Sequence, residues 1–270
     1  MSGEDRALGG HEIRDRVARP ARDDLGLILV DYDNLFSRDR RERSPSLVEH
    51  DLVSILREVR RRFPAAREFR IRLYGGWYQD GILTDHGSEV AGSVSSGIFP
   101  LVDRDRSVII RGEIELVDEL LAVPSVRFRE TFRRRGGLPR LRLAAVGSAP
   151  DGCAQPNASC PVAALRRFSR KKPSTCPVES CVVTSDDAFV VSEQKMVDAL
   201  LICDLLHAVE LRPAVVAAVT SDTDLLPALV QASVKSSERL VLIGDQSLWP
   251  ADHLLLLESL GVHLLLRSTS

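Results

Sequence analysis

The sequence contains no apolar run long enough to span a bilayer, and its first 24 residues lack the apolar core of a signal peptide. We therefore expect a cytoplasmic protein without a membrane partner, in which residues 1–24 form a polar, flexible tail. Cysteine is also scarce, with five residues in 270. In the cytoplasm such cysteines serve more often as thiols or metal ligands than as disulfides.

Aromatic residues make up only 5% of the chain, and the formal net charge is only −2. Basic residues nevertheless gather in four stretches, at Arg38–Arg43, Arg57–Arg62, Arg127–Arg142 and Arg166–Lys172. Such stretches are compatible with a polyanionic partner such as RNA. Because few aromatic residues accompany them, they do not indicate a platform on which several bases stack.

Apolar strands alternate with helical patterns over much of the chain. The segment 25–30 is a short apolar run typical of a buried parallel strand. Later segments repeat the alternation: a helix over about 193–210, a strand at 214–219, a helix over about 223–234, a strand at 239–243, a helix over about 249–259 and a strand at 262–266. This order predicts an α/β fold in which helices cover both faces of a parallel, Rossmann-like sheet.

The first half of the chain adds a helix over 46–63, a strand over 69–77 and an ambiguous segment at 81–97. Strand-like segments follow at 108–123, 126–132 and 138–146, with a hairpin turn predicted within 133–140. Residues 147–181 are rich in Pro, Ser, Gly and Cys. We interpret them as an insertion in a single domain that covers residues 25–270.

Acidic residues follow two of the predicted strands. Asp31 ends the first strand, and the run AVVAAVTSDTDLLPAL places Asp222 and Asp224 after a later one. Functional groups of such sheets collect at the carboxyl ends of strands. One acid there can be explained as a helix cap or turn residue, but capping does not account for both Asp222 and Asp224.

A further acid, Asp198, lies near the start of the predicted helix at 193–210. Apolar neighbours surround it, so we expect it to be largely buried. Asp204 lies on the same helix, but six residues further on it points well away from Asp198, and we interpret it as structural.

Carboxylates that converge on one point repel each other unless a cation neutralises them. Oxygen ligands favour Mg²⁺ or Mn²⁺, and such ions can orient water and stabilise the reacting oxygens in phosphodiester hydrolysis. The sequence thus permits a metal site formed by Asp31, Asp198, Asp222 and Asp224.

Three blocks resemble the signature of the NYN branch of the PIN-like nucleases. They are, in chain order, LILVDYDNL, EQKMVDALLICDLL and AVVAAVTSDTDLLPAL. The family pattern is a strand ending in D-x-x-N, then K-x-V-D in a helix, then a strand ending in S-x-D-x-D. The resemblance covers roughly residues 25–245, although the segment between the first two blocks is long and contains the Cys-rich insertion.

The resemblance implies a metal-dependent endoribonuclease on a PIN-like fold, whose products carry a 5′-phosphate and a 3′-hydroxyl. Asp31, Asp198, Asp222 and Asp224 would be the catalytic, metal-binding acids. Three further residues would serve the substrate: Asn34 would orient the first loop, Ser221 would bind near a metal or phosphate, and Lys195 would contact a substrate phosphate.

The cysteines suggest a second metal. Four thiolates can hold a structural Zn²⁺ tetrahedrally, and four cysteines fall in the insertion: Cys153, Cys160, Cys176 and Cys181. Their spacing is looser than the usual pairs, so reduced, unligated loop cysteines are the alternative. Cys203, on the apolar helix, is expected in the core.

Two other functions compete with the nuclease. LILVDYDNL also resembles the first motif of haloacid-dehalogenase-like phosphatases, which would make Asp31 a nucleophile and Asp33 an acid/base. A non-catalytic RNA-binding or scaffold protein on the same fold is the other alternative. Cleavage of RNA in the presence of metal would separate these functions, and a homo-oligomer is left open.

Overall fold

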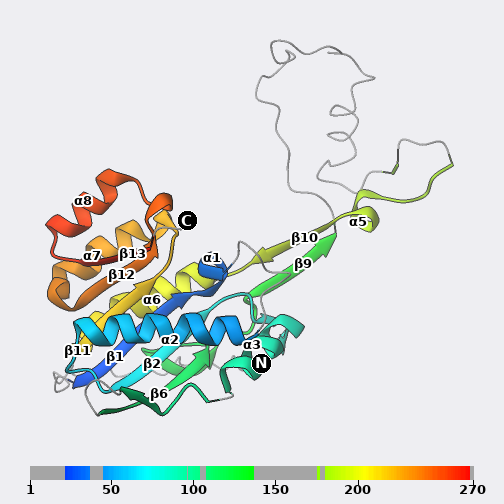
Figure 1. Cartoon of the computed structure of the whole chain (residues 1–270). Helices are drawn as coiled ribbons and strands as arrows, with labels where there is room; N and C mark the ends of the chain where they lie inside the picture. The colour runs from blue at the N-terminus through cyan, green and yellow to red at the C-terminus, as the bar shows by residue number, and fades with distance from the viewer. Residues whose placement is uncertain are drawn as a thin grey trace, which may run out of the picture.

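A mostly parallel sheet forms the centre of the computed structural model (Figure 1). The structure describes residues 22–36, 45–95, 97–103, 108–136, 175–176 and 180–267. From one edge to the other, the seven strands of the sheet are β13 (His263–Arg267), β12 (Leu240–Asp245), β11 (Pro213–Val219), β1 (Arg22–Asp31), β2 (Glu68–Tyr74), β6 (Val108–Leu116) and β5 (Leu101–Asp103). Only β5 runs antiparallel to its neighbour.

Strand β1 lies in the middle of this sheet, between β11 and β2. The chain first builds outward from β1 through β2 to β6, then returns to β11 and builds in the other direction through β12 to β13. This is the Rossmann strand order, and its topological switch point lies between β1 and β11. The predicted α/β class with a mostly parallel, Rossmann-like sheet is therefore confirmed.

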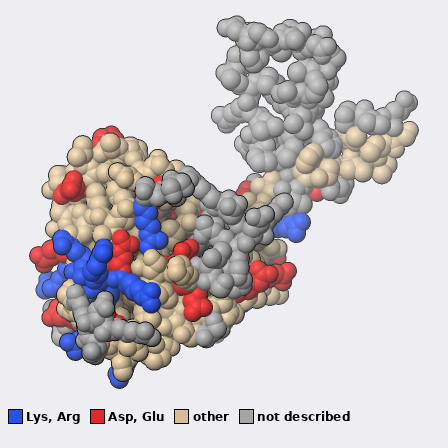
Figure 2. All heavy atoms as spheres, in the orientation of Figure 1, with Lys and Arg blue, Asp and Glu red and all other residues tan. Residues whose placement is uncertain are grey.

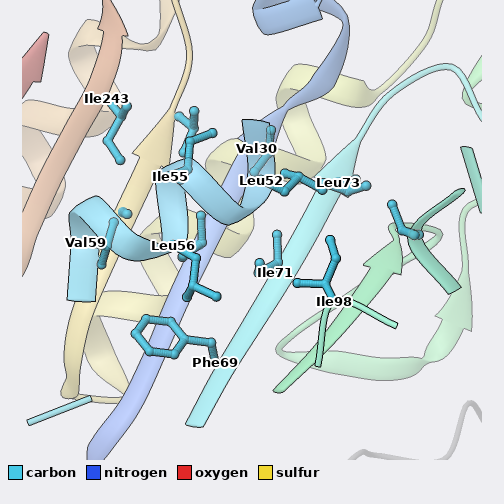
Figure 3. Packing of buried hydrophobic residues seen from close by; sticks show 14 of the residues in the cluster. Val30, Leu52, Ile55, Leu56, Val59, Phe69, Ile71, Leu73, Ile98 and Ile243 are labelled. Carbon is cyan, nitrogen blue, oxygen red and sulfur yellow. The ribbon is translucent and has the colours of Figure 1, made fainter. Parts of the chain in front are cut away.

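Helices α2 (Pro45–Arg62) and α3 (Asp85–Ser95) cover one face of the sheet. The face of α2 toward the sheet carries four fully buried side chains at helical spacing, Leu52, Ile55, Leu56 and Val59. Figure 3 shows them packed over residues of β1 and β2, among them Val30, Ile71 and Leu73. Each such side chain contributes roughly 1.5–3 kcal/mol on burial, which accounts for the docking of α2.

Three helices cover the opposite face: α6 (Val197–Glu210), α7 (Leu226–Ser236) and α8 (Ala251–Ser259). Leu27 and Leu29 of β1 point to this side, whereas Ile28 and Val30 point to the other, as strand alternation requires. A strand buried on both faces is apolar throughout, which explains the run at 25–30. Within the described part of the chain, no helix is long and apolar enough to cross a membrane.

A two-stranded arm projects from the body of the molecule (Figure 1). It consists of β9 (Phe132–Gly136) and β10 (Val190–Gln194), which pair antiparallel. The turn predicted from residue 133 is therefore wrong in its first part, because residues 133–136 continue the strand. The strand partner of β9 lies more than fifty residues away, a separation that local turn signals do not reveal.

The described chain also contains two small hairpins and several short helices, among them α1 (Tyr32–Phe36), η3 (Ser237–Arg239) and η4 (Gln246–Leu248). The hairpins are β3 (Tyr78–Gln79) with β4 (Ile82–Leu83) and β7 (Glu119–Leu120) with β8 (Val123–Arg127), and a further short helix is α5 (Ser185–Ala188). The ambiguous segment at 81–97 contains β4 and α3.

Several predicted boundaries move. Residues 193–194 belong to β10, so the helix predicted from about 193 begins at Val197. Residues 22–24, expected in the tail, begin β1, whereas residues 1–21 lie outside the described chain. The segment 138–146 and most of the predicted insertion at 147–181 also lie outside it.

Candidate functional site

The switch point brings the first and third sequence blocks together. Val30 of β1 lies opposite Val219 of β11, so the residues that follow, Asp31 and Thr220, meet at the carboxyl edge of the sheet. The close approach of β12 supports this edge from the other side. A Cβ atom on Gly244 would lie 2.4 Å from the carbonyl oxygen of Thr220, so glycine is required at that position.

Asp31 is the most deeply buried acid of this edge, with only 1% of its surface exposed. Its Oδ2 accepts hydrogen bonds from Nδ2 of Asn34 at 2.7 Å and from Oγ1 of Thr220 at 2.8 Å. Its Oδ1 is buried and has no hydrogen-bond donor among the described residues. Burial raises the pKa of Asp31, the hydrogen bonds from Asn34 and Thr220 partly oppose the shift, and the charge of Asp198 raises the pKa further.

Asn34 links the two strand ends. Its Nδ2 lies 3.5 Å from Oδ2 of Asp222, in addition to its shorter bond to Asp31. The backbone N–H of Asp222 donates to the Thr220 hydroxyl at 3.0 Å, and Oδ1 of Asp222 accepts from the backbone N–H of Asp224 at 2.9 Å. Asp222 thus caps the short helix η2 (Thr223–Leu225), while its second oxygen faces Asn34. Capping explains one oxygen of one acid, as the sequence suggested.

The second block reaches the same place through the start of α6. Asp198 lies in the first turn of this helix, and its pKa is raised by partial burial of the carboxyl group and by the negative charges of Asp222 and Asp224. The expectation that Asp198 is largely buried is wrong, because the residue as a whole is exposed. The start of α6 lies at the edge of the sheet, where one side of the helix faces solvent. Asp224 is exposed as well.

Neither Asp198 nor Asp224 receives a hydrogen bond on its carboxylate from any residue that the structure describes. The structure brings the four acids near one another. Hydrogen bonds hold the carboxylates of Asp31 and Asp222, whereas those of Asp198 and Asp224 accept none from the described residues. Among all the residues that the structure describes, no three His, Cys, Asp or Glu side chains surround a single point as metal ligands. The donor set consists of oxygen atoms only, which suits Mg²⁺ or Mn²⁺ rather than softer metals.

Asp33 has hydrogen-bond partners other than those of Asp31. Only 5% exposed, it accepts through Oδ2 from the backbone N–H of Gly76 at 3.2 Å and from the side-chain amide of Gln194. These bonds connect the end of β1 to the end of β2 and to the arm. Asp33 therefore holds these three segments together next to the site.

The other two predicted substrate residues lie at the rim of the site. Nζ of Lys195 pairs with Glu193 at 2.9 Å, and the Lys195 side chain is 45% exposed. Oγ of Ser221 accepts from the backbone N–H of Asp245 at 3.1 Å, which joins the loop after β11 to the end of β12. Between Lys195 and α6, Met196 adopts the left-handed conformation with φ 60°, which turns the chain sharply from the arm into the helix.

Asp204 occupies a different environment from that of Asp198. It is fully buried and accepts from the Tyr74 hydroxyl at 2.7 Å and from the backbone N–H of Leu121 at 2.8 Å. Nε of Arg72 lies 3.2 Å away, and this arginine is itself only 1% exposed. Arg72 also pairs with Glu115 at 2.5 Å.

The described cysteines lie apart from the acids. Cys176 and Cys181 are free, half-buried thiols, and the backbone N–H of Cys176 donates to the carbonyl of Val183 at 2.8 Å. Cys153 and Cys160 lie outside the described residues, so the zinc site stays a prediction. Cys203 is exposed rather than in the core, because α6 buries its other side against the sheet.

Basic side chains divide into several groups. Figure 2 shows Lys and Arg gathered over the end of α2, where Arg57, Arg61 and Arg62 are exposed. Because α2 ends where β2 begins, this group lies at the amino edge of the sheet, away from the acids. Arg127 and Arg129 both pair with Asp118, at 2.6 and 2.8 Å. Arg133 and Arg134 are exposed on the arm, close to the carboxyl edge.

Sequence reasoning missed Thr220, which is fully buried and contacts both Asp31 and Asp222. Its signal was a hydroxyl residue at the boundary between an apolar strand and two acids. Comparison with known proteins adds no assignment: no family model, curated protein or solved structure matches this chain.

Proposed function

We propose that this protein is a metal-dependent ribonuclease of the PIN-like, NYN type. The observation that carries the proposal is that four carboxylates from three separate segments lie near the switch point of a Rossmann-like sheet, close enough for their charges to interact. The four acids influence one another electrostatically: the charge of Asp198 raises the pKa of Asp31, and the charges of Asp222 and Asp224 raise the pKa of Asp198. Such repulsion is relieved by a bound cation.

The residues present fit a hard divalent cation. Buried carboxylate oxygens without a donor are costly, and Oδ1 of Asp31 is one. Asp31 and Asp222 would supply fixed ligands, while the exposed carboxylates of Asp198 and Asp224 are free to turn toward the ion. When bound, Mg²⁺ or Mn²⁺ lowers the pKa of water and stabilises charge that develops on the phosphate.

The chain itself would orient these groups. Asn34 and Thr220 hold Oδ2 of Asp31, and Oδ1 has no donor among the described residues. The Thr220 hydroxyl also accepts from the backbone N–H of Asp222, so one hydroxyl group orients both Asp31 and Asp222. Lys195 lies at the rim with its pairing partner Glu193, where an RNA phosphate could compete for its ammonium group.

The contacts of Asp33 favour the nuclease over the phosphatase. A dehalogenase-like mechanism needs the second aspartate of the motif as an acid/base beside the nucleophile. Here Oδ2 of Asp33 already accepts hydrogen bonds from the backbone N–H of Gly76 and from the side-chain amide of Gln194.

The test is cleavage of a panel of labelled RNAs and single-stranded DNAs with Mn²⁺, Mg²⁺ or EDTA. Wild type is expected to cleave RNA only with metal, and Asp31→Asn and Asp222→Asn are each expected to lose more than about 100-fold, beyond the loss typical of residues that only orient metal ligands. Asp23→Asn is the matched control, because Asp23 is an exposed acid at the opposite end of β1.

Three outcomes would contradict the proposal. RNA binding by folded protein without cleavage would favour the non-catalytic alternative. Hydrolysis of a small phosphomonoester that depends on Asp31 would favour the phosphatase. Equal losses of RNA cleavage in Asp23→Asn and Asp31→Asn would show that the active site does not lie at the switch point.

A further inference from the structure

A cleft of about 610 Å³ opens beside the acids, between the arm and the body. Its lining includes Asp33 and Gly76, which follow β1 and β2. Because Asp33 lies two residues after Asp31, the cleft begins within about 8 Å of the candidate metal ligand, measured between Cα atoms. A volume of this size falls in the range of small-ligand sites.

The two walls of the cleft come from different parts of the chain. Leu83 of the β3–β4 hairpin and His86 of α3 line the side of the body. Phe132 and Arg134 of β9 line the side of the arm, because alternate residues of a strand share a face. The intervening residue, Arg133, does not line the cleft.

The lining combines apolar surface with groups that form hydrogen bonds. Phe132 and Leu83 offer flat or apolar surface, and the Phe132 ring is fixed against Gly76, where an added Cβ would lie 3.0 Å from it. Gln79 and Gln194 supply side-chain amides. The His86 ring lies 5.8 Å from the rings of Tyr32 and Trp77, which ties this wall to the residue between Asp31 and Asp33.

The cleft also carries a positively charged side chain, Arg134. Arg134 is exposed at the cleft and makes no ion pair with a described residue, unlike Arg127 and Arg129, which pair with Asp118. Three aspartates, Asp33, Asp80 and Asp85, also line the cleft, so Arg134 is the group there that can attract a phosphate. An unpaired guanidinium beside an apolar wall suits a ligand with an aromatic ring and a phosphate. The side-chain amides of Gln79 and Gln194, which donate to Asp80 and Asp33, suit the edge of a nucleobase.

The geometry points to a nucleobase subsite: the cleft takes one unpaired base of a single-stranded substrate next to the scissile phosphate, with Phe132 stacking on the base and Arg134 binding the adjoining phosphate. This inference rests on the proposed nuclease function and assigns its substrate specificity. A base in a duplex is stacked and paired, so it cannot enter such a cleft without leaving the helix.

The experiment uses a short single-stranded RNA with one cleavage site and a series in which each base near that site is removed in turn. We expect one abasic position to lower kcat/KM about 10-fold, chiefly through KM, within the range that base–aromatic stacking supplies. Phe132→Leu keeps apolar volume and removes the ring. It is expected to cause a similar loss with intact RNA and almost none with the RNA that lacks this base.

Arg134→Gln is expected to raise KM about fivefold, whereas Arg133→Gln, the matched control on the other face of β9, leaves KM unchanged. Equal effects of the two variants, or a Phe132→Leu loss that is the same with intact and abasic RNA, would overturn the subsite. The abasic comparison is made within one variant, so a folding defect cannot imitate the expected result.

Equilibrium binding of the same RNAs separates failure of this inference from failure of the nuclease proposal. Binding that depends on the one base and on Phe132, without cleavage, would support the subsite and overturn the nuclease. Cleavage that no abasic substitution alters would overturn the subsite and leave the nuclease standing.

Discussion

Two aspartates on α6 show how a protein treats a buried or half-buried acid in opposite ways. Asp204 is fully buried, yet Tyr74, Leu121 and Arg72 satisfy its oxygens. Asp198, one and a half turns earlier, faces two other acids and receives no hydrogen bond from the described residues. A satisfied acid stabilises its surroundings, whereas a group of unsatisfied ones costs stability, and such costs are common where a site must bind a ligand.

The largest expected effect of this contrast is on stability. Asp204→Ala should lower the free energy of unfolding by about 3 kcal/mol, because it leaves the Arg72 guanidinium and the Tyr74 hydroxyl without a buried partner. Urea unfolding followed by circular dichroism measures the loss. Asp198→Asn should stay within about 0.5 kcal/mol of wild type, and similar losses for both variants would remove the distinction between the two acids.

For catalysis we expect the opposite: substitution of Asp198 has the large effect. Asp198→Asn should reduce RNA cleavage by more than about 100-fold, which corresponds to about 2.7 kcal/mol in the activation barrier. The measurement is kcat/KM at saturating Mn²⁺, on protein whose unfolding curve matches that of wild type. An active Asp198→Asn variant would leave Asp198 outside the site.

An intermediate effect is expected at Thr220, which touches the acids without being one. Thr220→Val keeps the shape of the side chain but removes the hydrogen bonds to Asp31 and to the backbone of Asp222. Cleavage should fall about 10- to 100-fold, as is typical when a residue that orients a metal ligand is lost. Thr220→Ser, which retains the hydroxyl, should recover most of the activity; a Ser variant as weak as Val would point to packing instead.

The smallest effect is a gain in stability. The pKa of Asp31 is raised in the folded protein, so the folded state holds this proton more tightly than the unfolded one, and ionisation destabilises the fold as pH rises above the ordinary value of 3.8. Without metal, Asp31→Asn should therefore unfold about 2–4 °C higher at pH 7, equivalent to about 1 kcal/mol, and show little gain at pH 4.

Thermal melts at the two pH values, with and without Mn²⁺, test this prediction. Mn²⁺ should raise the melting temperature of wild type and not that of Asp31→Asn, because binding requires the ionised carboxylate. A gain that is equal at both pH values would show that the charge of Asp31 is not its cause.

The sequence allowed the central architecture to be predicted because strands buried on both faces leave continuous apolar runs. The carboxyl ends of β1 and β11 could be recognised for the same reason: Asp31 and Asp222 interrupt apolar runs where no interruption is needed for folding. The exposure of Asp198 was predicted wrongly, because helical periodicity describes the whole of α6 and not the first turn, which lies at the sheet edge.

Contacts between distant segments could not be predicted. The pairing of β9 with β10 joins Phe132 to Gln194 across a long stretch of chain, and the turn residues after Arg133 suggested a local hairpin instead. The role of Asp33 depends on Gly76 and Gln194, which no spacing rule connects to it. The cleft beside Asp33 was missed because its two walls meet only in the folded chain.

The arm has a consequence for how this protein can vary. At its far end Gly136 lies opposite Val190, so the chain leaves and re-enters the fold through two adjacent residues. Residues could be added between Gly136 and α5 without moving either strand, since the entropy of closing a loop grows only slowly with its length, whereas α5 itself packs against β9. The far end of the arm is therefore a point at which the chain can be extended while the carboxyl edge of the sheet stays the same.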